Sequence, residues 1–373
     1  MDLTETPAQR EFRLEARDWL RENVPGQPLR SMDTAEGFEE HRGWERTLHE
    51  GGWSAVSWPA EYGGRGADLF EWLLFEEEYY AAGAPGRVNQ NGLFLLAPTL
   101  MEQGTDEQKA RFLPRIAAAD DIWCQGWSEP DSGSDLASLQ SRAIRDGEDW
   151  VLSGQKTWCS RGAFADWMFG LFRSDALSER HRGLTMILLP LDAPGVTVRP
   201  IVQLDGETGF AEVFLDDVRV SASEHTLGGD GGGWGVAMST AGFERGLLLR
   251  SPGRFVAAAA RLLALYDRVE DPPPGLRDEV IRAWMDAEAY RLSTLWTVSH
   301  LAEGGAIGFE ASMNKVFWSE MDIRMHQAAL ALGGTQDERW IDGFLFAQSG
   351  PIYAGTNEIQ RNIIAERMLG LPR

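Results

Sequence analysis

The sequence lacks three features that would each point to a particular class of protein. It has only two cysteines, Cys124 and Cys159, in 373 residues, too few for a disulfide framework, so we expect buried free thiols. No apolar run approaches the roughly 20 residues that a membrane span needs. The N-terminal stretch also lacks the basic and apolar layout of a signal peptide. We therefore expect a cytoplasmic protein without membrane association.

Positive charge is scarce as well. The sequence has 35 Lys and Arg against 57 Asp and Glu, a formal net charge of −22. Nucleic-acid-binding proteins need clustered Lys and Arg, so this balance argues against a nucleic-acid partner. It also gives no long-range attraction for an anionic ligand. Any phosphate binding must then come from local groups, such as backbone N–H groups, helix N-termini and single arginines.

Several common site motifs are missing too. The six histidines show no HExxH or comparable spacing, and there is no CxxC, so no metal site is expected. The glycine-rich "LGGDGGGWG" is not followed by Lys-Ser/Thr and does not fall in a βαβ unit. It is therefore neither a P-loop nor a dinucleotide fingerprint, and we read it as a connector. A GxSxG nucleophile motif is absent.

Residue patterns divide the chain into three segments. Residues 1–120 show helical spacing of apolar residues, and in "GTDEQKARFLPRI" Thr105 and Gln108 form a capping box. Residues 121–225 contain short stretches rich in β-branched and aromatic residues with no helix between them, which predicts an antiparallel sheet or small barrel. Helical spacing returns over residues 226–373. The fold class is therefore α+β multidomain, with helices, then strands, then a helical bundle.

Two stretches of the strand segment have an unusual composition. "WCQGWSEPDSGSD" combines hydroxyl and small residues with Trp127, and "SGQKTWCS" adds Trp158 beside Cys159 and Ser160. Aromatic faces beside convergent hydrogen-bond donors suit a planar ring system that bears phosphates, such as a flavin. On composition alone, two ordinary turns with core tryptophans explain the same residues.

The order of motifs resembles the acyl-CoA dehydrogenase family over nearly the whole chain. The resemblance lies in "WPAEYGGRGAD", "WCQGWSEPDSGSDLASL", "DWVLSGQKTWCSRGAFADW", "GWGVAMSTAGFERG" and "IYAGTNEIQR". It implies an N-terminal helical domain, a middle β-barrel-like domain and a C-terminal four-helix bundle, with FAD between the last two and a neighbouring subunit. The implied flavin-binding residues are Gln125, Trp127, Ser128, Ser134, Trp158, Ser160, Thr356 and Glu358.

The position of the catalytic base departs from many relatives. Dehydrogenation of a thioester needs a carboxylate at the α-proton, and many family members place a glutamate where this chain has Ala354. In one branch the base comes instead from the helix matching "AGFERG", which implies Glu244 as base, with Arg245 near the acyl-CoA. The backbone N–H at Ala354, followed by Gly355, would serve the thioester carbonyl. On the residues alone, a solvated helical Glu–Arg pair is the preferred interpretation of Glu244 and Arg245.

Two further departures concern the flavin. The family's Arg-x-x-Phe-Gly stretch is replaced by "RFVAAAARLLALYDRVEDPPPG", and Leu330 stands where a glutamine commonly contacts flavin phosphate. We predict FAD-dependent α,β-dehydrogenation of an acyl-CoA or acyl-carrier-protein thioester in fatty acid metabolism, with electron-transfer flavoprotein as acceptor and a homodimer or tetramer as assembly. The alternatives are a flavin oxidase or monooxygenase, and a half-site subunit of a hetero-oligomeric dehydrogenase.

Overall fold

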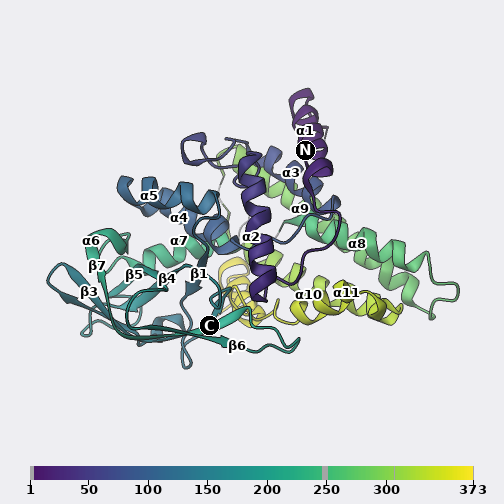
Figure 1. Ribbon diagram of the computed structural model, residues 1–373. Helices are drawn as coiled ribbons and strands as arrows, with labels where there is room; N and C mark the ends of the chain where they lie inside the picture. The colour runs from purple at the N-terminus through teal and green to yellow at the C-terminus, as the bar shows by residue number, and fades with distance from the viewer. Residues whose placement is uncertain (1–3, 246–250, 306, 373) are drawn as a thin grey trace. The chain divides into compact units, whose positions relative to one another are not determined.

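The computed structural model describes residues 4–245, 251–305 and 307–372, with the side chains of Glu244 and Arg245 outside that description. Within these residues the chain runs from helices through strands to helices, which confirms the expected order (Figure 1). It divides into two compact units. Unit 1 comprises the chain up to Val24, Ala67–Ala84 and the chain from Arg245 onward. Unit 2 comprises Pro25–Gly66 and Pro85–Glu244.

Unit 2 holds the sheet and the helices that flank it. Capping boxes and N-caps begin the helices as the sequence indicates: the Thr105 hydroxyl accepts from Gln108 N at 3.2 Å, which confirms the capping box predicted there. In Figure 1, α5 (Asp106–Ala117) and α7 (Gly233–Arg245) lie beside strands β4 (Trp167–Arg173) and β5 (Leu184–Pro190). The helical elements of unit 2 are α2 (Ala35–Glu50), η1 (Ala60–Tyr62), the π-helix η2 (Asn91–Leu96), α4 (Ala97–Gln103), α5 (Asp106–Ala117), η3 (Leu136–Ser138), α6 (Ala222–His225) and α7 (Gly233–Arg245).

The sheet of unit 2 is mostly antiparallel. Its strands are β1 (Trp123–Gly126), β2 (Arg142–Asp146), β3 (Asp149–Ser160), β4 (Trp167–Arg173), β5 (Leu184–Pro190), β6 (Val196–Ile201), β7 (Phe210–Ser221) and β8 (Thr226–Leu227). Their order is β6-β7-β3-β2-β4-β5-β8. One feature differs from the antiparallel expectation: β1 pairs with β4 in parallel, and β2 meets β4 in parallel at one residue pair. β1 is only four residues long, too short to show a strand pattern in the sequence.

The core of unit 2 lies on the sheet and is apolar. β5 is buried along nearly its whole length, and side chains of β1, β3, β4, β5 and β7 form one cluster. Cys124 and Cys159 both lie in that cluster as free thiols, as expected from their number. A hydrogen bond with the Cys159 thiol, together with burial, raises the pKa of Cys124. Both thiols therefore act as small apolar groups.

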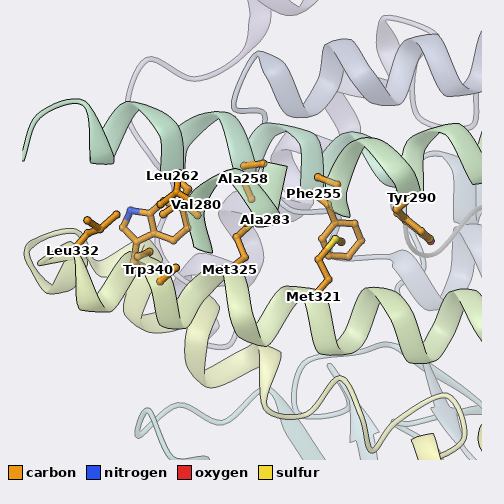
Figure 2. Close-up of a cluster of buried hydrophobic side chains, with 14 of the residues drawn as sticks. Phe255, Ala258, Leu262, Val280, Ala283, Tyr290, Met321, Met325, Leu332 and Trp340 are labelled. Carbon is orange, nitrogen blue, oxygen red and sulfur yellow. The ribbon is translucent and has the colours of Figure 1, made fainter. Parts of the chain in front are cut away.

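Unit 1 is a helical assembly. Its elements are α1 (Pro7–Asn23), α3 (Leu69–Ala81), α8 (Pro252–Tyr266), α9 (Leu276–Ala302), α10 (Glu310–Ala331), η4 (Gly334–Gln336), α11 (Glu338–Ala347), α12 (Asn357–Ile363) and the π-helix η5 (Ile364–Met368). Side chains of α8, α9, α10 and α11 meet in one buried cluster that includes Phe255, Met321 and Trp340 (Figure 2). Gly253 lets α8 approach α3 closely, because a Cβ there would lie 2.7 Å from the Glu76 carbonyl oxygen.

The first helices of the chain are shared between the units. α1 and α3 belong to unit 1, whereas α2, α4 and α5 belong to unit 2. The expected domain boundaries near residues 120 and 225 remain predictions. The two compact units are drawn from separate stretches of the chain and so do not test these boundaries. Among the described residues, the helices lack the combination of length and apolar character that a bilayer crossing requires. The same residues contain no group of three His, Cys, Asp or Glu placed to hold a metal ion.

Candidate flavin and substrate site

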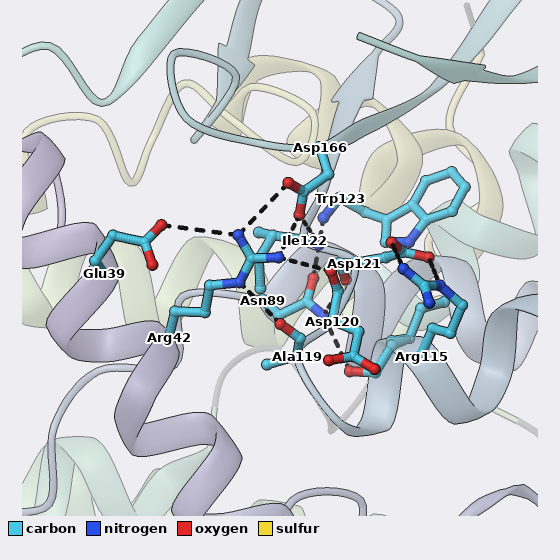
Figure 3. A network of polar contacts seen from close by, with 11 residues as sticks. Glu39, Arg42, Asn89, Arg115, Ala119, Asp120, Asp121, Ile122, Trp123 and Asp166 are labelled. Atoms are coloured by element: carbon cyan, nitrogen blue, oxygen red, sulfur yellow. Dashed lines mark hydrogen bonds and ion pairs between the residues drawn. The ribbon is translucent and has the colours of Figure 1, made fainter. Parts of the chain in front are cut away.

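A polar network fixes the start of β1, the strand that leads into the first candidate loop (Figure 3). Arg42 binds the Asp166 carboxylate at 2.8 Å, and the same carboxylate accepts from Ile122 N at 2.8 Å. The Asn89 side chain accepts from Trp123 N at 3.1 Å. Because these contacts hold residues 122 and 123, the path of the chain from Gln125 to Ser128 is set from one side.

The loop after β1 is held from the other side by a buried ion pair. Lys156, fully buried in β3, places its Nζ 2.7 Å from Glu129 Oε1 and 2.6 Å from the Leu171 carbonyl oxygen. The Glu129 carboxylate also accepts from Gln140 N at 2.6 Å and Ser141 N at 2.9 Å. Burial opposes its charged form, but Lys156 and these N–H groups outweigh that effect and lower the pKa of Glu129. Burial lowers the pKa of Lys156, and the Glu129 carboxylate opposes that effect. The ammonium and both carboxylate oxygens have hydrogen-bond partners.

Trp127 lies at the start of this loop, and its indole nitrogen has no hydrogen-bond partner among the described residues. Its side chain is 8% exposed, and its ring meets Phe169 edge-on. Its Nε1 is buried and makes no hydrogen bond within the described residues. A buried donor without an acceptor destabilises the fold by about 1–3 kcal/mol. A ligand oxygen at this position would relieve that cost, so the site fits a bound group with acceptor atoms, such as a flavin.

Trp158 presents the opposite arrangement, an aromatic ring held outward. The register of β3 against β7 shifts between Lys156 and Cys159, and Trp158 adopts φ 58°. A left-handed conformation costs a non-glycine residue roughly 1–2 kcal/mol. The result is a tryptophan that is 60% exposed, although its neighbour Cys159 is buried. The composition-based alternative of two core tryptophans is therefore wrong for Trp158, and the exposed ring fits a stacking surface.

The remaining predicted flavin residues of unit 2 lie on the same stretch of chain. Gln125 and Ser128 are half-buried at the end of β1 and just after it, while Ser134 is exposed. The Ser128 carbonyl accepts from Thr157 N at 2.9 Å, which joins the loop to β3. The Ser160 carbonyl accepts from the Asn91 side chain at 3.4 Å. The structure thus brings together the two stretches that the sequence separates by about 30 residues.

The C-terminal candidate loop lies in unit 1 and has a distinct geometry. Ala354 and Gly355 adopt φ 57° and φ 78°. Gln360, fully buried in α12, donates from Nε2 to the carbonyl oxygens of Ala354 at 3.1 Å and Gly355 at 3.4 Å. Thr356 caps α12 by accepting from Ile359 N at 3.3 Å. The Ala354 N–H has no hydrogen-bond partner among the described residues, so it remains available to an acceptor.

The remaining predicted residues of the C-terminal half are Glu358, Glu244 and Arg245. Glu358 is exposed in the first turn of α12, where the local backbone N–H and the Thr356 hydroxyl lower its pKa. The side chains of Glu244 and Arg245, the proposed base and its neighbour, lie outside the described residues. Both residues end α7, whose Thr240 bonds Thr99 of α4 at 3.0 Å. Gly231, two residues before this helix, donates from its N–H to the Thr185 hydroxyl of β5 at 2.9 Å.

Sequence reasoning missed the residues that hold the loops. Lys156 and Glu129 stood inside the quoted motifs without a role, as did Asn357, whose Oδ1 accepts from buried Lys315 at 2.9 Å. The signal available for Lys156 was a lysine inside a strand, in a chain that has only three lysines. Leu330, in place of a glutamine, packs against the core of unit 1 and offers no polar contact to a phosphate.

Comparison with known proteins agrees with the motif series. The N-terminal, middle and C-terminal domain models of the acyl-CoA dehydrogenases match residues 6–120, 124–218 and 231–369. The acyl-CoA dehydrogenase IpdE1 of Mycobacterium tuberculosis is 41% identical, covering 97% of this chain and 98% of its own.

Solved structures are similar over full length. The Tcur3481-Tcur3483 steroid acyl-CoA dehydrogenase has a TM-score of 0.88 at 29% identity, covering 100% of both chains. The ChsE4-ChsE5 complex of Mycobacterium tuberculosis has a TM-score of 0.83 at 30% identity, again covering 100% of both chains. This chain therefore belongs to the acyl-CoA dehydrogenase family, whose members are FAD-dependent flavoprotein oxidoreductases.

Proposed function

We propose that this chain dehydrogenates the α,β-bond of an acyl-CoA thioester, with Glu244 removing the α-proton and the Ala354 N–H donating to the thioester carbonyl. The observation that carries the proposal is the geometry of the C-terminal loop. Gln360 holds the carbonyls of Ala354 and Gly355, and the Ala354 N–H makes no internal hydrogen bond within the described residues. An unpartnered donor on a fixed loop suits an oxygen on which negative charge develops.

The choice of Glu244 as the base follows from the absence of a carboxylate at residue 354 of the C-terminal loop. An α-proton beside a thioester is weakly acidic, and a positioned base contributes ~10²–10⁴-fold in rate. Residue 354 is alanine, so this loop supplies no carboxylate at that position. Glu244 lies in α7, four residues after buried Thr240, and positions 240 and 244 share one face of that helix. α7 belongs to the same unit as the Trp127 loop, which supports Glu244 as the replacement base.

The flavin is proposed to lie against Trp127, Ser128 and Trp158. FAD, when bound, supplies a two-electron acceptor for the hydride that leaves the β-carbon. The chain contributes an unpartnered indole N–H at Trp127 and an exposed indole face at Trp158. Gln125, Ser134, Ser160, Thr356 and Glu358 are proposed as the remaining contacts. Electron-transfer flavoprotein is the proposed acceptor of the electrons.

The substrate is proposed to carry a bulky, ring-bearing acyl group. Support comes from a relative: Tcur3481-Tcur3483, with a TM-score of 0.88, is a steroid acyl-CoA dehydrogenase. A polycyclic acyl group also explains why a relative of the fatty acyl enzymes would move its base, since alanine at 354 leaves more room than glutamate. CoA is proposed as the carrier in preference to carrier protein, because the IpdE1 relatives are acyl-CoA dehydrogenases.

The assembly is proposed to be a hetero-oligomer with a second chain of the same family. Two solved relatives are named as pairs of different chains. Leu330 faces the core of unit 1 and the Arg-x-x-Phe-Gly stretch is absent, so this chain supplies fewer phosphate contacts. α9 also exposes Ile281, Trp284, Met285, Leu292 and Trp296 by 39–57%. Such an apolar stripe on one helix is typical of an interface.

The test is an anaerobic titration of the flavin-loaded protein, alone and with candidate partner chains, against linear and ring-bearing acyl-CoA esters. We expect wild type to lose its oxidised flavin absorbance with ring-bearing esters. Glu244→Gln should bind FAD normally and stay oxidised, while Glu224→Gln, a change at an exposed residue of α6, should behave as wild type. Bleaching by Glu244→Gln refutes the base. Rapid oxygen consumption after reduction would indicate an oxidase instead.

A further inference from the structure

Lysine is rare in this chain and its placement is selective. The sequence contains Lys109, Lys156 and Lys315 against 32 arginines. Lys109 is partly exposed and lies 3.9 Å from Asp106. Lys156 and Lys315 are 0% and 1% exposed, and both rank among the largest fully buried side chains. An ammonium is compact with three rotatable donors, whereas a guanidinium is a planar fork. Two of the three lysines therefore lie where the cation is enclosed.

Lys156 ties down the loop that follows β1. Its Nζ contacts Glu129 Oε1 at 2.7 Å and the Trp127 carbonyl oxygen at 3.5 Å, on either side of Ser128. The Ser128 carbonyl itself accepts from Thr157 N, the residue after Lys156, at 2.9 Å. Three consecutive loop residues are thus held by two consecutive residues of β3. The loop has little freedom to move without breaking the ion pair.

Lys315 ties down the C-terminal loop in unit 1 in a comparable way. Its Nζ donates to Asn357 Oδ1 at 2.9 Å, and the Ser319 hydroxyl donates to the same oxygen at 3.1 Å. Asn357 N in turn donates to the Pro351 carbonyl at 2.8 Å. Asn357 is the first residue of α12, so these contacts fix the turn that carries Ala354 to Thr356.

We infer that Lys156 and Lys315 are positioning residues, each holding one of the two loops that carry the proposed flavin contacts. The inference rests on the proposed function, because it requires that these loops bind FAD. Binding groups must be held within about 0.5 Å of their working positions. Loss of either ammonium would leave its loop free to shift, and the flavin contacts would weaken although neither lysine touches the flavin.

The first test compares one chemical change at three sites. Lys156→Met, Lys315→Met and Lys109→Met each remove one ammonium and keep the side-chain length. We expect FAD affinity, measured by quenching of flavin fluorescence in the holoprotein assembly, to fall about tenfold or more for the two buried sites. The absorbance spectrum of residual bound flavin should also shift. Lys109→Met should stay within about twofold of wild type, since Lys109 holds no loop.

A second set of variants separates positioning from simple stability. Glu129→Gln/Lys156→Met removes both buried charges, so it should regain thermal stability relative to Lys156→Met. FAD affinity should stay low, because the contacts to the Trp127 and Leu171 carbonyls remain lost. On the other loop, Asn357→Asp keeps the acceptor for Lys315 and loses only the long 3.4 Å hydrogen bond that the amide donates to Glu320, so it should bind FAD nearly as wild type. Asn357→Leu, which removes the acceptor, should not.

Each outcome decides one point. A double variant that regains both stability and FAD affinity shows that Lys156 serves only to balance a buried charge, and refutes positioning at that loop. Lysine variants that bind FAD as tightly as Lys109→Met overturn the whole inference while leaving the proposed function intact. A wild-type assembly that takes up no FAD overturns the proposed function, and the inference with it.

Discussion

Replacing Trp127 by phenylalanine tests whether a bound flavin accepts its indole N–H. Without ligand the buried Nε1 is unpartnered within the described residues, and removing it relieves about 1–3 kcal/mol. Phenylalanine also gives up roughly 40 Å² of buried ring, about 1 kcal/mol at roughly 25 cal/mol per Å². The two effects oppose each other, so the free energy of unfolding of the FAD-free protein should change by only about 1 kcal/mol.

FAD binding should respond more strongly than stability. If a flavin oxygen accepts the Trp127 N–H, the variant loses a hydrogen bond worth about 1–1.5 kcal/mol, which corresponds to about tenfold weaker binding. The assay is titration of FAD into apoprotein, followed by fluorescence quenching, with denaturant unfolding of the same samples. Unchanged FAD affinity in Trp127→Phe would refute the assignment.

Trp123→Phe is the matched control. Its Nε1 is also buried and unpartnered within the described residues, but its ring stacks on Trp167 at 5.1 Å and meets Phe112 at 5.4 Å in the core. The same substitution should therefore change stability to a similar extent and leave FAD affinity within about twofold of wild type. Equal weakening in both variants would mean that the effect comes from β1 as a whole and not from the Trp127 donor.

Two further predictions concern stability. Burial opposes the charge of Glu78, but hydrogen bonds from two arginines of α1 outweigh it and lower its pKa from 4.5. Glu78→Gln should therefore reduce the free energy of unfolding by about 1–3 kcal/mol at pH 7. The difference from wild type should vanish as the pH falls below 4.5 through that lowered pKa, because Glu78 is then protonated. Denaturant titrations measure both effects, with the exposed Glu22→Gln as control. Gly126→Ala should lower the melting temperature through about 1–3 kcal/mol of overpacking, since its Cβ would lie 2.1 Å from Met168 Sδ, whereas Gly43→Ala, in open space within α2, should not.

Local rules predicted most of the elements. The helix starts carry side-chain caps that can be seen in the sequence, as with Thr105 and Gln108, and β3 to β7 follow stretches rich in β-branched and aromatic residues. β1 was missed because four residues between a helix and a turn carry no period. Its pairing with β4 depends on contacts from Asn89 and Asp166, which no local pattern reveals.

The motif order predicts which residues line the site, among them Trp127, Ser128 and Trp158, and that membership stays a prediction. Composition could not tell an exposed tryptophan from a buried one, and it gave no sign of the residues that hold the loops. The buried charged residues that hold the loops could not be predicted from the sequence for a related reason. Lysine and glutamate are usually solvated, so a charged pair such as Lys156 and Glu129 becomes recognisable only when its enclosure and its several hydrogen bonds are known.

The two candidate loops share a property that links the strain of the backbone to function. Trp158 and Ala354 both adopt left-handed conformations, each at roughly 1–2 kcal/mol for a residue with a Cβ. A loop free to relax would abandon such a conformation. Here a strand bulge fixes the first and Gln360 fixes the second, so the surrounding structure sustains the strain. The result is an indole face turned outward and a backbone N–H that has no acceptor among the described residues, the two features on which the proposed flavin and thioester contacts rest.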